Sequence, residues 1–316
     1  MFTTAPNGFL YLLLTVAMLS GHLPLRGVWH ERAENQLGGS ANLLSEQARS
    51  KATNKEIRQL AASERSSIAE SFIIVARDVE TYALLRQEVG TLPEQSAEFF
   101  GSQAVVAVFL GQRPTGGFGI EIIGAPDGSI RITERRPPKN AMVKMVLTAP
   151  SKVVAIPSGP NESLSFSLDE TWKNKFRTYR LTSGEITISG GIQGITQKLR
   201  IQGTIEVVQA GSWATFVFDI QGSTDKTSRS LLDTASGRID SSGKITLRHL
   251  DSFGLTGAIQ SPFRATGGFT NHDQDLNIHL ETIGASQISD NFTAQGSLTA
   301  TAAELPSKKP TQPRRP

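Results

Sequence analysis

The segment from Gly237 to Ile245 superficially resembles a phosphate-binding loop. Such a loop needs four residues between its two glycines and a serine or threonine after its lysine, because backbone amides and a hydroxyl must surround the phosphates and their metal. Here five residues separate Gly237 from Gly243, and Ile245 follows Lys244. Ser241 and Lys244 have the S-x-x-K spacing of penicillin-recognising enzymes, but in a turn and not on a helix. The segment therefore predicts a hairpin turn without catalytic chemistry.

Metal-binding chemistry has equally weak support. The chain has five histidines and no cysteine, so thiolate zinc sites and disulfides are excluded. His279 lies on the polar face of an alternating segment, which is typical of a solvent-facing side chain. Asn271, Asp273 and Asp275 approximate a calcium loop, but the required glycine and distal glutamate are missing. We expect no metal and no cofactor.

No G-x-S-x-G motif marks a serine nucleophile, and we predict no catalytic residues and no enzymatic activity. A hydrolase whose site is assembled from distant residues stays open as an alternative. The formal net charge of +3 is too small for a strong positive field, so nucleic acid is not an expected partner. The basic residues near the C-terminus fall among prolines in 305–316, which we predict to be a disordered tail.

The N-terminus has the character of an export signal. Residues 1–26 hold the apolar run Phe9 to Ser20, whose length suits a signal-peptide core better than a membrane span. We expect a signal peptide or an N-terminal anchor, and hence a periplasmic, cell-surface or extracellular protein that contacts membrane only if this segment is uncleaved. Residues 27–68 lack a continuous apolar stripe and are predicted to be a polar spacer.

Residues 69–158 predict an α+β domain of one helix and about five strands. Asp78 is a plausible N-cap for a helix that runs through Val89 and stops at Gly90. Ala104 to Leu110 is a continuous apolar run, typical of a strand buried on both faces. The further predicted strands are 118–123, 129–133, 141–147 and 153–156.

The C-terminal part alternates apolar and polar residues. After a predicted linker at 159–183, residues 184–304 show a period of two with one apolar face, as in Phe216, Phe218 and Ile220. This pattern predicts a mainly β protein whose second domain is an antiparallel β-sandwich or small barrel.

The unusual feature is the string Gly111 to Ile122, GQRPTGGFGIEI, which lies between two strand-like runs. Pro114 fixes a backbone angle and the paired glycines accept positive φ, so turn chemistry predicts a hairpin. A hairpin alone needs no particular arginine, threonine and aromatic residue. The candidate interaction loop is therefore Arg113, Pro114, Thr115, Gly116, Gly117 and Phe118.

This string resembles the G-x-x-P-T-G-G-Y-x-I-x-I signature of the C-terminal domain of the protease complex subunit PrcB family. The flanking AEFFGSQAVVAVFLG and TAPSKVVAIP match the domain in style and order, so the resemblance covers about residues 70–158. Phe118 replaces the usual tyrosine, which leaves no phenolic hydroxyl at this position. The family is named for a surface lipoprotein that associates with an extracellular subtilisin-like protease complex, and this chain lacks a lipidation cysteine.

Three functions follow as hypotheses. The resemblance implies an exported accessory or binding protein that associates with, or stabilises, an extracellular protease complex. The alternating C-terminal strands suggest instead a carrier or binding protein for an apolar ligand or a carbohydrate. A cryptic hydrolase is the third.

Overall fold

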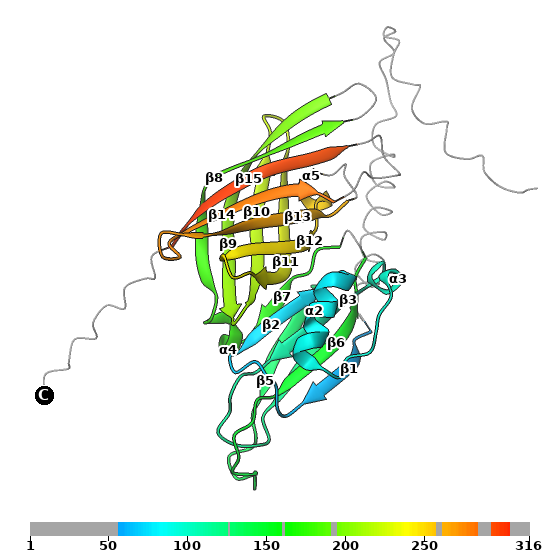
Figure 1. Cartoon of the computed structure of the whole chain (residues 1–316), viewed down its shortest axis with the longest axis vertical. Helices are drawn as coiled ribbons and strands as arrows, with labels where there is room; N and C mark the ends of the chain where they lie inside the picture. Colours follow the sequence, from blue (N-terminus) through cyan, green and yellow to red (C-terminus); the bar gives the residue numbers. More distant parts are fainter. Residues whose placement is uncertain are drawn as a thin grey trace, which may run out of the picture. The chain divides into compact units, whose positions relative to one another are not determined.

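The computed structural model describes residues 56–125, 127–159, 162–190, 195–256, 261–283 and 292–303. These residues form a small α+β part followed by a closed β-barrel (Figure 1). The predicted signal or anchor (1–26), most of the predicted spacer and the predicted tail (305–316) lie outside the described residues.

A four-stranded antiparallel sheet forms the centre of the α+β part, in the order β1-β6-β3-β2. Its strands are β1 (Arg58–Ser63), β6 (Ser151–Pro157), β3 (Gln103–Phe109) and β2 (Phe72–Ala76). Val105 and Ala107 pack on one face with Tyr82 and Leu85, while Ala104, Val106 and Val108 pack on the other. The continuous apolar run is therefore a strand buried on both faces, as predicted.

Helix α2 (Val79–Val89) begins and ends as its residues predict. The Asp78 carboxylate accepts a hydrogen bond from the Thr81 amide at 2.7 Å, and Gly90 closes the helix with φ of 73°. The short helices are α3 (Ala97–Phe100), α4 (Glu170–Lys173) and α5 (Phe253–Thr256). No helix in the described part of the chain is long and apolar enough to cross a membrane.

A second sheet of three strands covers one face of the first. It contains β4 (Gly119–Gly124), β5 (Ile130–Arg135) and β7 (Phe166–Leu168), in that order. β4 and β5 pair as the predicted hairpin around Gly128, whose φ is 83°. The hairpin predicted across Gly111 to Ile122 is wrong, because β3 and β4 belong to different sheets. The glycine-rich loop carries the chain from one sheet to the other.

Three other segments differ from prediction. Residues 141–147 form no strand, and Met142, Met145 and Leu147 are exposed, so their apolar character does not reflect burial. β1 lies within the segment 27–68 that was predicted to be a spacer. The segment 159–183, predicted to be a linker, contains β7, α4 and the start of β8, which pack against the sheets.

The C-terminal part is a closed antiparallel barrel of eight strands in the order β10-β11-β12-β13-β14-β15-β8-β9. The barrel strands are β8 (Arg177–Gly190), β9 (Ile195–Ala210), β10 (Trp213–Ser223), β11 (Ser228–Ile239), β12 (Lys244–Leu250), β13 (Phe263–Thr270), β14 (Asp275–Thr282) and β15 (Thr293–Ala302). Of the two predicted architectures, the barrel is the one found. β15 pairs with β8 and closes the sheet, which removes free strand edges.

The apolar face of the alternating strands forms the barrel core. Phe216, Phe218 and Ile220 belong to one continuous cluster of buried side chains. On the opposite face of the same barrel wall, Val208, Ala210 and Trp213 join the core of the α+β part, together with residues of β2 and α2. The barrel and the α+β part therefore share a packed boundary.

The edge strand β2 is covered at this boundary by hydroxyl groups of the barrel. The Val75 amide donates to Ser236 Oγ at 2.9 Å, and Thr215 Oγ1 donates to the Ile73 carbonyl at 2.5 Å. Thr215 and Ser236 are opposed on β10 and β11 and contact each other. Polar groups that an edge strand leaves unpaired are thus satisfied by side chains.

Candidate functional site

The loop between β3 and β4 depends on two glycines with positive φ. Gly111 has φ of 75°, and a Cβ there would lie 2.8 Å from backbone atoms of Ala69, Glu70 and Ser71. Gly117 has φ of 86°, and a Cβ there would lie 3.0 Å from a methyl group of Val143. A side chain at Gly111 would meet backbone that cannot easily move, so glycine is required by both angle and space.

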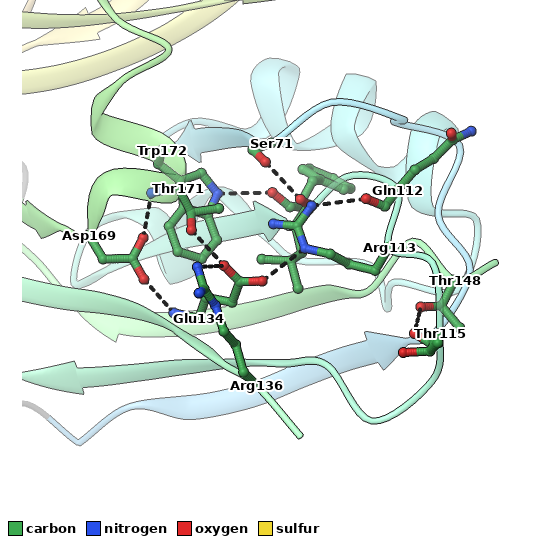
Figure 2. Close-up of polar contacts among 12 residues, drawn as sticks. Ser71, Gln112, Arg113, Thr115, Glu134, Arg136, Thr148, Asp169, Thr171 and Trp172 are labelled. Carbon is green, nitrogen blue, oxygen red and sulfur yellow. Dashed lines mark hydrogen bonds and ion pairs between the residues drawn. The ribbon is translucent and has the colours of Figure 1, made fainter. Parts of the chain in front are cut away.

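The loop is fixed to the segment that precedes β6. The Arg113 amide donates to the Thr148 carbonyl at 2.8 Å, and the Thr148 amide returns a bond to Arg113 at 3.0 Å. Thr148 Oγ1 donates to the Thr115 carbonyl at 2.9 Å, as Figure 2 shows. The Gly116 amide donates to the Lys144 carbonyl at 2.9 Å. The predicted interaction loop is therefore one of two loops joined through their backbones.

The Arg113 side chain points toward Glu134 and Phe118. Its side chain is 18% exposed, its Nε donates to Glu134 Oε1 at 2.9 Å, and its guanidinium lies 5.9 Å from the centre of the Phe118 ring. Phe118 is partly buried and packs against the core between the two sheets. These two residues of the motif hold the loop in shape.

Glu134 links this loop to α4, which lies after the PrcB-like segment. The side chain is 4% exposed and accepts hydrogen bonds from Arg113 and from Thr171 Oγ1, the latter at 2.7 Å (Figure 2). The Asp169 carboxylate accepts from the amides of both Glu134 and Thr171. Burial raises the pKa of Glu134, but these hydrogen bonds and the charges of Arg113 and Arg136 outweigh it, so the pKa lies below its ordinary value.

A shallow depression of about 670 Å³ lies beside the loop. Its lining includes Arg113, Pro114, Phe118 and Glu134 together with charged residues of neighbouring segments such as Arg136. Within the predicted site, Pro114 and Gly117 are exposed, Arg113, Thr115 and Phe118 are partly buried, and Gly116 is buried. The exposed part of the predicted site is thus limited to Pro114 and Gly117.

The supporting residues had no sequence signal. Glu134, Asp169 and Thr171 lie far along the chain from the motif and belong to no recognisable pattern, so only the fold identifies them. The apolar residues of 141–147 predict a strand from sequence, whereas the structure exposes their side chains in a loop.

The other candidate residues occupy turns. Asp240 Oδ1 accepts from the amides of Ser242 and Lys244, and Gly243 has φ of 79°, so the P-loop-like string is a hairpin turn. His272 lies in a turn with positive φ. Across the residues that the structure describes, no three or more side chains of metal-ligating type lie close enough to hold an ion.

Together these features define a β-rich protein in which a two-sheet α+β unit with a glycine-dependent loop adjoins a closed barrel. Residues 104–157 match the sequence model of the family described as PrcB C-terminal, which confirms the resemblance. The match runs from β3 to β6 and contains both joined loops, while the barrel lies outside it. No curated protein matches the chain.

Proposed function

We propose that this chain is an exported, non-enzymatic accessory protein that binds or stabilises an extracellular protease complex. The observation that carries the proposal is the PrcB C-terminal match over 104–157, with the loop Arg113 to Phe118 at its centre. The protein acts in the periplasm, at the cell surface or outside the cell. The apolar run at Phe9 to Ser20 supports export.

The site geometry supports binding by a preformed surface. The loop is fixed by backbone bonds to Thr148 and Lys144 and by the Arg113–Glu134 ion pair, so little conformational entropy is lost when a partner binds. Pro114, which lines the charged depression, and Gly117 are exposed and accessible to a partner. A preformed surface of this kind suits an accessory subunit, which acts by binding.

Affinity purification of the tagged chain from the envelope or medium of its own organism tests this proposal. We expect a peptidase activity to co-elute, and Pro114→Glu to reduce it about tenfold if the loop carries a binding hot spot. Leu232→Glu, on the exposed surface of β11, is the matched control and should leave the yield unchanged. Absence of any co-eluting peptidase with the unmodified chain would refute the association.

The proposed lack of enzymatic activity is tested separately. The purified chain should release no product from peptidase, esterase or glycosidase substrates above the buffer rate. Turnover that co-purifies with the chain through successive columns would instead establish the hydrolase alternative.

The closed barrel is the observation that favours the carrier alternative, since small barrels hold apolar ligands. Against this, bulky side chains such as Phe216, Phe218 and Phe263 pack together inside it. Native mass spectrometry of the chain purified without detergent decides the point: a bound lipid or glycan of defined mass supports a carrier, and a bare chain argues for a structural barrel.

A further inference from the structure

The loop between β5 and β6 exposes several large apolar side chains that no neighbouring segment among the described residues covers. Met142 is 105% exposed, Met145 is 86% exposed and Leu147 is 68% exposed, while Val146 is also on the surface. Large apolar side chains that are clustered on a surface usually mark an interaction site. We name residues 139–147 the apolar loop.

The apolar loop is ordered by the neighbouring glycine-rich loop. Lys144 accepts the Gly116 amide through its carbonyl, and Val143 packs where Gly117 has no side chain. The Ala141 amide donates to the Pro138 carbonyl at 2.9 Å. The PrcB-like motif therefore fixes a second loop whose apolar side chains point into solvent. Figure 1 shows the two loops at the end of the α+β part that lies away from the barrel.

Positive charge accompanies these apolar side chains. Lys139 and Lys144 are exposed on the loop itself. Arg135 and Arg136 are exposed where the chain enters it, and Arg136 forms an ion pair with Glu134 at 3.3 Å. No aspartate or glutamate occurs from residue 135 to residue 148. The backbone carbonyl of Glu64 accepts a hydrogen bond from the amide of Ala149, which directly follows this segment. The surface around the apolar loop thus favours an anionic partner.

We propose that the apolar loop inserts into the surface of a bilayer that contains anionic phospholipid. Interfacial segments place apolar side chains at the boundary of the acyl region and lysines or arginines among the headgroups. Methionine and leucine side chains projecting from a loop suit this role, because a lipid surface needs no matching groove. This contact is separate from the N-terminal segment and does not depend on protease association.

The absence of cysteine from the chain makes the test specific. In the full chain, Met145→Cys is labelled with an environment-sensitive fluorophore and mixed with vesicles of phosphatidylglycerol and phosphatidylcholine in equal parts. Leu232→Cys, labelled in the same way on the exposed face of β11, is the matched control. Even if the N-terminal segment holds the chain on the vesicle, only the label in the apolar loop should enter the apolar layer.

We expect the label at position 145 to shift its emission to the blue with anionic vesicles and much less with pure phosphatidylcholine, and the label at position 232 not to shift. In the Met145→Cys background, Lys139→Gln with Lys144→Gln should lower partitioning about tenfold, since each cation near an anionic surface adds to binding. High salt should have the same effect. Both lysine side chains are exposed, so the variants should fold.

Several results would overturn the proposal. The first is no shift at position 145, and the second is an equal shift at both positions. The third is a label at position 145 whose emission does not change with vesicles but which becomes protected from iodide quenching in a concentrated envelope extract. This result would indicate a protein partner. A shift that survives both lysine substitutions would also count against a role for anionic headgroups.

Discussion

Arg77, which directly follows β2, forms a buried ion pair with Asp233 on β11. The guanidinium donates two hydrogen bonds to the carboxylate, at 3.2 and 2.5 Å, and the side chains are 4% and 0% exposed. β11 pairs with β12 only over Gly237–Ile239, so Asp233 lies where these two strands have separated. The amides of Leu164 and Asp251 also donate hydrogen bonds to the Asp233 carboxylate. This pair ties the α+β part to the barrel wall.

Asp233→Asn should therefore destabilise the chain by about 3–5 kcal/mol, because it leaves the Arg77 charge buried without a counter-charge. Urea unfolding followed by circular dichroism measures the loss. The control is Glu185→Gln at the exposed ion pair with Lys198, where a loss below about 1 kcal/mol is expected. Equal losses in the two variants would show that the Arg77–Asp233 pair does not stabilise the boundary.

The hydroxyls that cover β2 give a second prediction, from two threonines of equal size and burial. Thr215 bonds to Ile73 and Ser236, whereas Thr234 Oγ1 has no hydrogen-bond partner among the described residues. Thr215→Val should cost about 1–3 kcal/mol because the Ile73 carbonyl loses its partner, and Thr234→Val should be neutral or stabilising.

Chemical denaturation gives both differences, and amide exchange gives a local check at Val75, whose partner Ser236 contacts Thr215. Exchange at Val75 should accelerate in Thr215→Val and not in Thr234→Val. A larger loss for Thr234→Val would mean that water satisfies its hydroxyl and that the boundary is stabilised differently.

These contacts also mark the limit of what the sequence could predict. The α2 helix followed from Asp78 and Gly90, and the barrel strands from alternation, because those signals are local. The Gly111 to Ile122 hairpin was mispredicted because turn residues show that a chain bends, but not which strand it meets next. The strand predicted over 141–147 is wrong, because apolar side chains on an exposed loop have the same composition as those of a buried strand.

In the candidate site, too, the residues with a local sequence signal were predicted and those defined by tertiary contacts were not. Its loop was found from the motif between Arg113 and Phe118, since those residue types are unusual for a turn. Glu134 and Thr171 were not, because their roles depend on tertiary contacts with Arg113 and with each other. Polar residues at such separations carry no periodic or motif signal, so a single sequence cannot identify them.

The glycine at the start of the loop gives a third prediction. Gly111 and Gly90 have nearly the same φ, 75° and 73°, but a Cβ at Gly111 would meet backbone at 2.8 Å and one at Gly90 would meet nothing within 4 Å. Gly90→Ala should cost about 1 kcal/mol for the left-handed conformation alone. Gly111→Ala should cost at least about 2 kcal/mol more, because backbone near Ser71 must move. Thermal and urea unfolding measure the loss of stability in both variants. Equal losses would show that the backbone around Gly111 moves aside without a free-energy cost.

Acid titration of stability tests the role of Glu134. Its pKa in the folded chain lies below the ordinary value of 4.5, because the hydrogen bonds from Thr171 and Arg113 outweigh the effect of burial. The carboxylate therefore contributes stability that is fully present above pH 4.5 and is lost as the pH falls through the lowered pKa. Glu134→Gln lacks this contribution. At neutral pH it should be less stable than the unmodified chain by about 2 kcal/mol.

The difference between the two chains should shrink as the pH is lowered below 4.5, where the unmodified carboxylate becomes protonated. Thr171→Val provides the matched comparison, since it removes one of the bonds that lower the pKa and should weaken the acid dependence without abolishing it. Urea unfolding at a series of pH values from neutral to acid measures all three chains. A difference that stays constant over this range, or grows on acidification, would mean that Glu134 supports the loop by packing and not by its charge.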